Sequence, residues 1–239
     1  MPFRTPDDRP LDELLLAQHP ADVHRFVLRA GFRYDDPVSG RRYDVGAGRV
    51  TDLASVPMWL WSFIASHGRQ SAPAVLHDDR SAVADCIDDR RAALALRRED
   101  DRVFRTALRE QRVPLLRGWL MWAWVSADRE REYGGAAGVV FMVQAIVGTL
   151  VVVAASVAAF WHPAWLALAL LPALAALAWG RLAPLMLLLN YPTAVLAPLI
   201  VVHVASVVPF RLIEALVELV TGGDPAGVWR PTVRARRSS

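Results

Sequence analysis

Residues 138–160 read GVVFMVQAIVGTLVVVAASVAAF, a stretch without Asp, Glu, Lys or Arg. About 20 predominantly apolar residues in a helix are enough to cross the hydrocarbon core of a bilayer. A helix that is apolar on all sides is rare at the surface of a soluble protein. The stretch therefore predicts a membrane-spanning helix, and the rest of the chain is interpreted outward from it.

Two more apolar segments follow. Residues 163–180 come after a Trp-His-Pro turn, and because Pro ends helices and Trp favours the membrane interface, they predict the second arm of a helical hairpin. Residues 182–209 are uncharged but contain Pro192 and Pro198, which fits either a kinked third span or a re-entrant segment. The second half of the chain is thus expected to be an α-helical transmembrane domain.

The end of the chain carries a few charges. Residues 210–220 hold one Arg and two Glu and predict a short amphipathic helix lying on the membrane surface, followed by an Arg-rich tail. Arginines favour the cytoplasmic side, whereas three full spans would place the two ends of the chain on opposite sides. The topology stays open at this stage, since it depends on whether 182–209 crosses.

Charge divides the chain into two domains. Residues 1–135 contain 21 Arg and 21 acidic residues, whereas residues 136–239 contain six Arg and three acidic residues. This asymmetry predicts a soluble domain over 1–135 and a membrane domain over 136–239 of a multi-pass cell-membrane protein. The polar start of the sequence lacks the apolar core of a signal peptide, so the soluble domain is expected in the cytoplasm. All 27 residues counted as Lys or Arg are Arg, a bias that is typical of proteins encoded by GC-rich bacterial genomes.

The soluble domain is predicted to be α+β, with a small antiparallel sheet followed by helices. Aromatic and branched residues suggest strands over 24–34 and 41–51, joined by a turn rich in Asp, Pro and Gly into a β-hairpin. Ser55 and Pro57 form a typical helix start. Further helices are expected at residues 72–79, 85–110 and 117–131, with Val113-Pro114 as an interruption.

Residues 45–57 read VGAGRVTDLASVP. This string resembles the V-P-A-G-F-x-T-D-x-A-S-x-P signature of the phage-associated family called domain of unknown function 1353. Residues 74–78 (AVLHD) resemble the family's A-x-x-H-D, and residues 98–104 resemble its R-x-x-A-D-x-x-F. The likeness covers about residues 24–131 and departs from the family pattern at Gly46, at Asp100 and after Asp78.

The polar residues that this resemblance carries over are Asp52, Ser55, His77, Asp78, Arg98 and Asp101. A histidine with carboxylates can bind one divalent metal ion and activate water. In this hypothesis His77 and Asp52 are ligands, Asp101 is a ligand or general base, and Arg98 binds an anionic substrate. Because His77 and Asp78 are adjacent on a helix, their side chains point about 100° apart. Asp78 is therefore expected to serve as an orienting or capping group and not as a second ligand of the same ion.

The alternatives are structural or use serine chemistry. Asp52 can cap the following helix, His77 can be a buried hydrogen-bonded histidine, and Arg98 and Asp101 have the i,i+3 spacing of a surface ion pair. Ser55 as nucleophile with His77 as base needs their proximity in space. Nucleic acid is not an expected partner, because acidic residues offset the arginines between positions 97 and 117.

Two function classes follow. The favoured one is a membrane-anchored accessory or binding protein of phage or prophage type, which contacts the lipid bilayer and a protein partner at the cytoplasmic membrane face. It is favoured because the sequence contains no established catalytic motif. The alternative is a membrane-tethered metal-dependent hydrolase that uses Asp52, His77 and Asp101.

Overall fold

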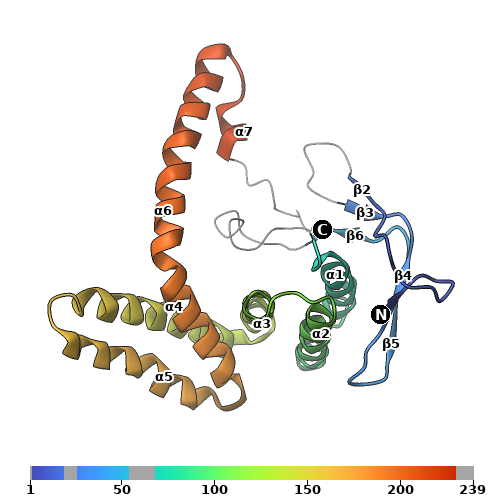
Figure 1. Ribbon diagram of the computed structural model, residues 1–239, viewed down its shortest axis with the longest axis horizontal. Helices are drawn as coiled ribbons and strands as arrows, with labels where there is room; N and C mark the ends of the chain where they lie inside the picture. The colour runs from blue at the N-terminus through green and yellow to red at the C-terminus, as the bar shows by residue number, and fades with distance from the viewer. Residues whose placement is uncertain (1, 19–25, 54–67, 230–239) are drawn as a thin grey trace.

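A computed structural model of the chain describes residues 2–18, 26–53 and 68–229. The predicted helix start at Ser55 and Pro57 and the Arg-rich tail at 230–239 lie outside the described residues. Figure 1 shows a sheet region and helices α1 to α3 on one side, and the apolar helices α4 to α6 on the other.

Within the described residues, six short strands form two antiparallel sheets. One has the order β1-β4-β5, with strands Phe3–Arg4, Phe32–Asp35 and Arg42–Val45. The other has the order β2-β3-β6, with strands Leu16–Gln18, Phe26–Leu28 and Val50–Thr51. The antiparallel sheet and the hairpin between β4 and β5 confirm the sequence prediction.

The two long strands predicted at 24–34 and 41–51 are each broken into two short ones. Gly31 lies at the break and allows a close backbone approach, since an added Cβ would lie 2.7 Å from the carbonyl oxygen of Val45. On the partner strand, Gly48 has a φ of 86°, which favours glycine. Both strands therefore bend at the same level. On one side of the bend β4 pairs with β5, and on the other side β3 pairs with β6.

Alternation along the strands fixes which face is buried. In β4, Phe32 and Tyr34 are buried while their neighbours are half-exposed, and in β5 Tyr43 and Val45 alternate in the same way. These side chains pack on Val75, Leu76, Val103 and Ala107 in one core cluster. The sheet region thus rests on α1 (Ser71–Asp85) and α2 (Arg90–Glu110).

Helix α3 (Leu115–Tyr133) joins the two parts of the molecule. Its Met121 packs with Phe104 and Leu108 against α1 and α2. Its Ala123 packs with Phe141 and Leu185, which belong to the apolar helices. The helices predicted at 72–79, 85–110 and 117–131 are therefore present with shifted ends, and the break at Pro114 is confirmed as the N-cap of α3.

Helix α4 (Gly135–Ala158) covers the first predicted span. After a turn, the 3-10 segment η2 (Pro163–Ala169), α5 (Leu170–Ala176) and the 3-10 segment η3 (Leu177–Leu182) return beside α4 as the second arm of a hairpin (Figure 1). Two helical runs, Gly135–Ala158 and Pro163–Thr221, are long and apolar enough to cross a membrane by length and composition.

Helix α6 (Ala183–Thr221) corrects one expectation. Residues 182–209 and 210–220 were predicted as a Pro-interrupted segment and a separate amphipathic helix, but α6 runs through both without interruption. It contacts α4 closely, since a Cβ on Gly148 would lie 2.6 Å from Nδ2 of the buried Asn190. A short helix, α7 (Pro225–Trp229), follows a left-handed Gly222.

Candidate functional site

The centre of the candidate site is a buried contact between α1 and α2. Nε2 of His77 lies 2.9 Å from Oδ1 of Asp101. The two side chains are 8% and 0% exposed, so solvent hardly reaches either of them. The ring of His77 also packs on Phe104, with 4.8 Å between the ring centroids. The sequence prediction thus placed two of its site residues correctly as neighbours in space.

Helix α3 supplies the other half of this contact. Nη1 of Arg129 donates to Oδ2 of Asp101 at 2.5 Å, and the hydroxyl of Ser126 donates to the same oxygen at 3.1 Å. Arg129 is also buried, and its Nη2 lies 2.9 Å from Oε1 of Glu130. Both carboxylate oxygens of Asp101 are therefore occupied by donors from two neighbouring helices.

The charges set the protonation state of Asp101. Burial alone would raise the pKa of this carboxyl. The hydrogen bond and charge of His77 and the charges of Arg129 and Arg97 act against burial and lower the pKa below its usual value. Asp101 is thus an ionised carboxylate held inside the protein by cationic neighbours.

Arg98 does not take part in this contact. Its side chain is 51% exposed, and Nη2 lies 3.3 Å from Oε1 of Glu130 on α3. The predicted helix-surface pair with Asp101 is not formed, since Asp101 points inward to His77 and Arg129. When the family motif is aligned on Asp101, its arginine corresponds to Arg97, which is the buried one of the two and donates to the hydroxyl of Ser81.

Asp78 faces away from His77, as the helical geometry predicts. Its carboxyl is hydrogen-bonded to the hydroxyl of Thr51 at the end of β6, and this hydroxyl also accepts from the backbone N–H of Leu53 at 2.9 Å. Burial and the nearby charge of Asp52 raise the pKa of Asp78 well above its usual value, while the bond to Thr51 acts in the opposite direction. Asp78 therefore ties α1 to the second sheet.

Asp52 lies apart from the buried contact between His77 and Asp101. It is half-buried and lines a hollow of about 480 Å³, whose other described lining residues are Leu14, Leu16, Phe26, Leu53, Gly68 and Ser71. The hollow is lined mainly by apolar side chains, and its lining also includes Asp52 and Ser71. The structure thus brings His77 and Asp101 together and places Asp52 near Asp78 instead.

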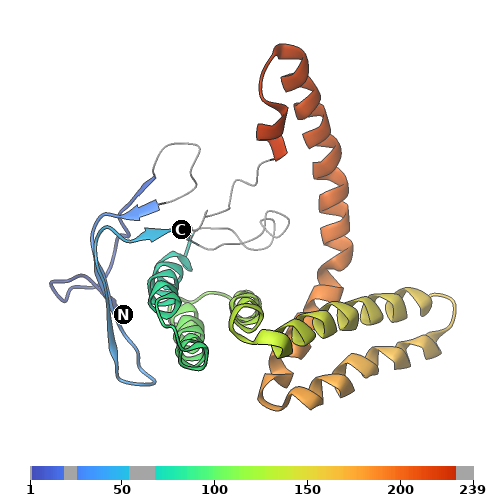
Figure 2. The ribbon, with the colours of Figure 1, turned by 180° about the vertical axis from the view of Figure 1, so that it is seen from behind.

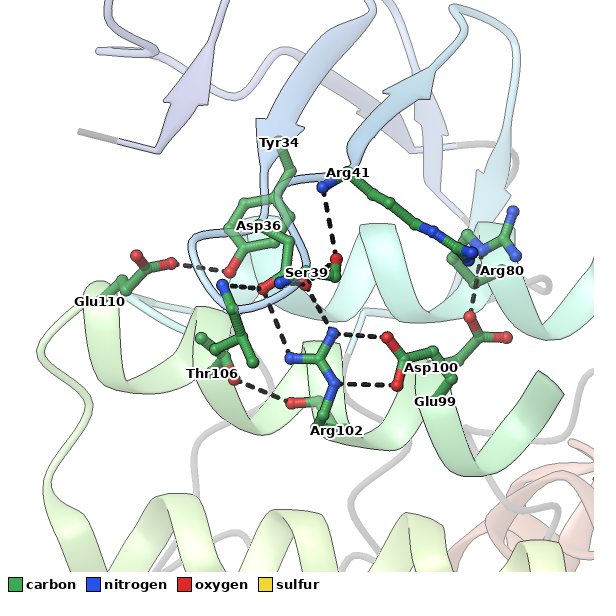
Figure 3. Close-up of polar contacts among 11 residues, drawn as sticks. Tyr34, Asp36, Ser39, Arg41, Arg80, Glu99, Asp100, Arg102, Thr106 and Glu110 are labelled. Carbon is green, nitrogen blue, oxygen red and sulfur yellow. Dashed lines mark hydrogen bonds and ion pairs between the residues drawn. The ribbon is translucent and has the colours of Figure 1, made fainter. Parts of the chain in front are cut away.

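A second charge network fastens the β4–β5 turn to α2 (Figure 3). Arg102 donates to Asp36 at 2.5 Å and to Glu99 at 2.6 Å. Asp36 also accepts from the N–H of Ser39 at 3.1 Å, which closes the turn. Burial would raise the pKa of Asp36, but the bonds from Arg102 and Ser39 outweigh it and lower the pKa to about 2.

Figure 3 also shows how the sheet and the helices are held together on either side of this turn. The hydroxyl of Tyr34 donates to Glu110 at 2.7 Å. Arg80 on α1 donates to Asp100 on α2 at 3.1 Å, and its guanidinium lies 5.3 Å from the ring centroid of Tyr43. All five residues are charged or aromatic and they come from four elements, β4, β5, α1 and α2, so the network is tertiary in origin.

Within residues 2–18, 26–53 and 68–229, no group of three or more His, Cys, Asp or Glu side chains is placed to hold a metal ion. Three side chains, His77, Ser126 and Arg129, contact the two oxygens of Asp101, whose side chain is 0% exposed. Ser55, the alternative nucleophile, lies outside the described residues.

Sequence reasoning missed the partners that complete the site: Ser126, Arg129, Glu130, Arg97 and Thr51. The one signal in the sequence was the charged run at the end of a Trp-rich helix, residues 128–132, which reads DRERE. That run resembles an ordinary solvated helix end. Only its position against α2 turns Arg129 and Glu130 inward.

Comparison with known proteins identifies one family. Residues 26–125 match the model of the family described as "Protein of unknown function (DUF1353)", which confirms the resemblance seen in the motifs at 45–57 and 74–78. No curated protein and no solved structure matches the chain. The match ends within α3, so α4 to α7 lie outside it.

Replacing Asp101 by Asn is expected to destabilise the fold strongly, because it removes the buried carboxylate that both His77 and Arg129 contact and leaves Arg129 with Glu130 as its remaining negative partner. Breaking one partner of a buried ion pair costs about 3–5 kcal/mol. The matched variant Arg98→Gln removes a half-exposed pair and should cost less than about 1 kcal/mol. Thermal melting of the full chain in a mild detergent measures both, and equal small losses would contradict the structural role of Asp101.

The raised pKa of Asp78 predicts a pH dependence of stability. A carboxyl whose folded pKa lies above its unfolded value of about 3.9 contributes stability that is full below that value and is lost as pH rises through the folded pKa. Wild-type stability should therefore fall as the pH rises above about 4, and that of the permanently neutral Asp78→Asn variant should fall less. Melting temperatures of both proteins across this range test the prediction, and parallel curves would refute it.

Proposed function

We propose that the protein is a membrane-anchored accessory or binding protein whose helices α4 to α6 lie in lipid. The observation that carries the proposal is the apolar surface of these helices. On α4, the half-exposed side chains are Val139, Val140, Val143, Ile146, Val147 and Leu150. A contiguous apolar surface of this kind is unfavourable in water and is typical of membrane or protein contact.

The outer half of α6 supports the same proposal. Val195, Val201 and Val220 are 74%, 65% and 78% exposed, and apolar side chains surround the helix on every side. A helix that is apolar all round is expected inside a membrane or a large core. Arg211 and Glu214 lie on this helix as an ion pair, 3.0 Å apart, which lowers the cost of carrying both near lipid.

The region before α4 is then the part that meets a partner. The buried contacts of Asp101 and Asp36 connect α1, α2, α3 and the β4–β5 turn. A protein partner at the membrane face and a phage or prophage origin belong to this proposal as well. They are supported by the motif resemblance at residues 45–57 and by the absence of a recognised catalytic motif in the sequence.

Membrane anchoring is tested by placing a charge on the lipid-facing side of α4. Val147→Arg should reduce membrane insertion, since Arg at the centre of a spanning helix costs about 2.5–3.5 kcal/mol. The control Val38→Arg changes a 66% exposed residue in the β4–β5 turn and should leave insertion unchanged. The measured quantity is the fraction of chain that resists alkaline extraction from membranes. Wild-type protein that is fully soluble without detergent would overturn the proposal.

The metal-dependent hydrolase is tested by metal content. Because Asp101 is fully hydrogen-bonded, we expect the full-length protein, purified in detergent and incubated with zinc, manganese or magnesium, to retain less than one ion per chain. Asp52→Asn serves as the matched control, since it alters a half-buried carboxylate and leaves His77 and Asp101 intact. One stoichiometric ion that is lost in the Asp52→Asn variant would favour the hydrolase.

A further inference from the structure

The turn between α2 and α3 has an unusual residue at its centre. The N–H of Arg112 donates to the carbonyl of Arg109 at 3.0 Å, and the N–H of Val113 donates to that of Leu108 at 3.0 Å. This pair of bonds is the Schellman ending of a helix, in which glycine usually takes the left-handed position. Here Arg112 takes it, with a φ of 55°. The fold alone would favour glycine, so the arginine side chain needs another explanation.

More arginines gather around the same turn. Nη1 of Arg69 donates to the carbonyl of Arg112 at 3.2 Å, and Nη1 of Arg109 donates to that of Val113 at 3.3 Å. Among the residues that the structure describes, neither of them forms an ion pair with a carboxylate, nor do Arg112 and Arg117. Arg102 and Arg129, in contrast, each contact two carboxylates. The turn therefore carries positive charge that no carboxylate of the described residues pairs with.

Apolar side chains lie between these charges. Leu115 and Leu116, in the first turn of α3, are 55% and 64% exposed. One turn further along, Trp119 and Trp122 stack edge to face, with 5.7 Å between ring centroids. The guanidinium of Arg105 lies 5.1 and 5.0 Å from these two ring centroids. Arginine, leucine and tryptophan on one surface are the residues that favour the boundary between lipid and water.

The position of α3 connects this surface to the apolar helices. Trp122 packs against the cluster that contains Phe141 of α4 and Met186 of α6. Figure 2 shows α3 between α1 and α2 on one side and the start of α4 on the other. Helix α3 thus carries the arginines and leucines at its N-terminal end and contacts the apolar helices through Trp122.

We propose that this surface, the basic turn face, binds the headgroups of anionic phospholipids. It consists of Arg69, Arg109, Arg112, Leu115, Leu116 and Arg117. The arginines attract the negative surface of the bilayer, and the two leucines enter the headgroup region. The inference rests on the proposed function, because it requires α4 to α6 to hold the protein at a membrane.

The experiment places a reporter on the full chain. Cys86 is the single cysteine, so a Cys86→Ser background allows Leu116→Cys to be labelled with an environment-sensitive dye. The labelled protein is reconstituted into vesicles of phosphatidylcholine alone or with about one third phosphatidylglycerol, each containing a nitroxide-labelled lipid as quencher. Val38→Cys, in the 66% exposed turn between β4 and β5, is the matched control site.

We expect strong quenching at position 116 in phosphatidylglycerol vesicles and weak quenching in phosphatidylcholine vesicles, with none at position 38. The quenching should decrease in high salt, since screening weakens surface attraction. Each arginine contributes about a fivefold change in lipid partitioning. Arg112→Gly should therefore weaken the contact about fivefold while it raises the melting temperature, because glycine relieves the left-handed backbone. This combination separates loss of a binding group from misfolding.

Three outcomes would overturn the inference. Equal quenching in both lipids would show apolar contact without charge recognition, and no quenching in chains that remain inserted would place the face in water. Loss of quenching on addition of an oligonucleotide at low salt would identify a nucleic-acid surface instead. If the unlabelled chain fails to float with vesicles of either composition, the membrane anchoring itself fails, and the two failures are thereby distinguished.

Discussion

The structure depends on one buried charge. Asp101 is fully buried and ionised, so it requires hydrogen-bond partners and positive charge around it, and its direct contacts are His77 from α1 and Arg129 from α3. A buried carboxylate without such partners would be strongly unfavourable, and this requirement holds α1, α2 and α3 together around one side chain. Helix α3 then presents Ala123 to the apolar helices, so their attachment to the protein depends on the same carboxylate.

The remaining polar contacts extend this constraint to the sheets. Asp36 with Arg102 holds the β4–β5 turn on α2, and Asp78 with Thr51 holds the second sheet on α1. Every one of these contacts joins elements that are distant in the sequence. Buried polar networks of this kind specify a unique packing more than they add stability.

The sequence predicted the parts of the fold that depend on local properties. The helices and the hairpin could be predicted from the spacing of apolar residues, from Pro114 and from the turn residues between β4 and β5. The break in the strands could not be predicted, because it arises where Gly31 approaches Val45 across the sheet. At the site, the motif indicated His77 and Asp101, whereas Arg129 looked like part of a solvated charge run. Its role depends on the packing of α3 on α2, which leaves no periodic signal in the sequence.

Helix length limits how the apolar helices can lie in a bilayer. At about 1.5 Å per residue, α4 is about 36 Å long and matches a hydrocarbon core of about 30 Å, whereas α6 is about 58 Å long. In both ribbon views the α4–α5 hairpin and the outer part of α6 run across each other (Figures 1 and 2). They cannot therefore both stand upright in one flat membrane. If α4 to α6 lie in lipid as proposed, length matching favours the hairpin as the upright element, and α6 must then be inclined within the lipid. An upright hairpin also brings the end of α3 that joins α4 to the level of the lipid headgroups. The proposed lipid contact of the basic turn face rests on this placement, and it would account for an arginine at the left-handed position 112.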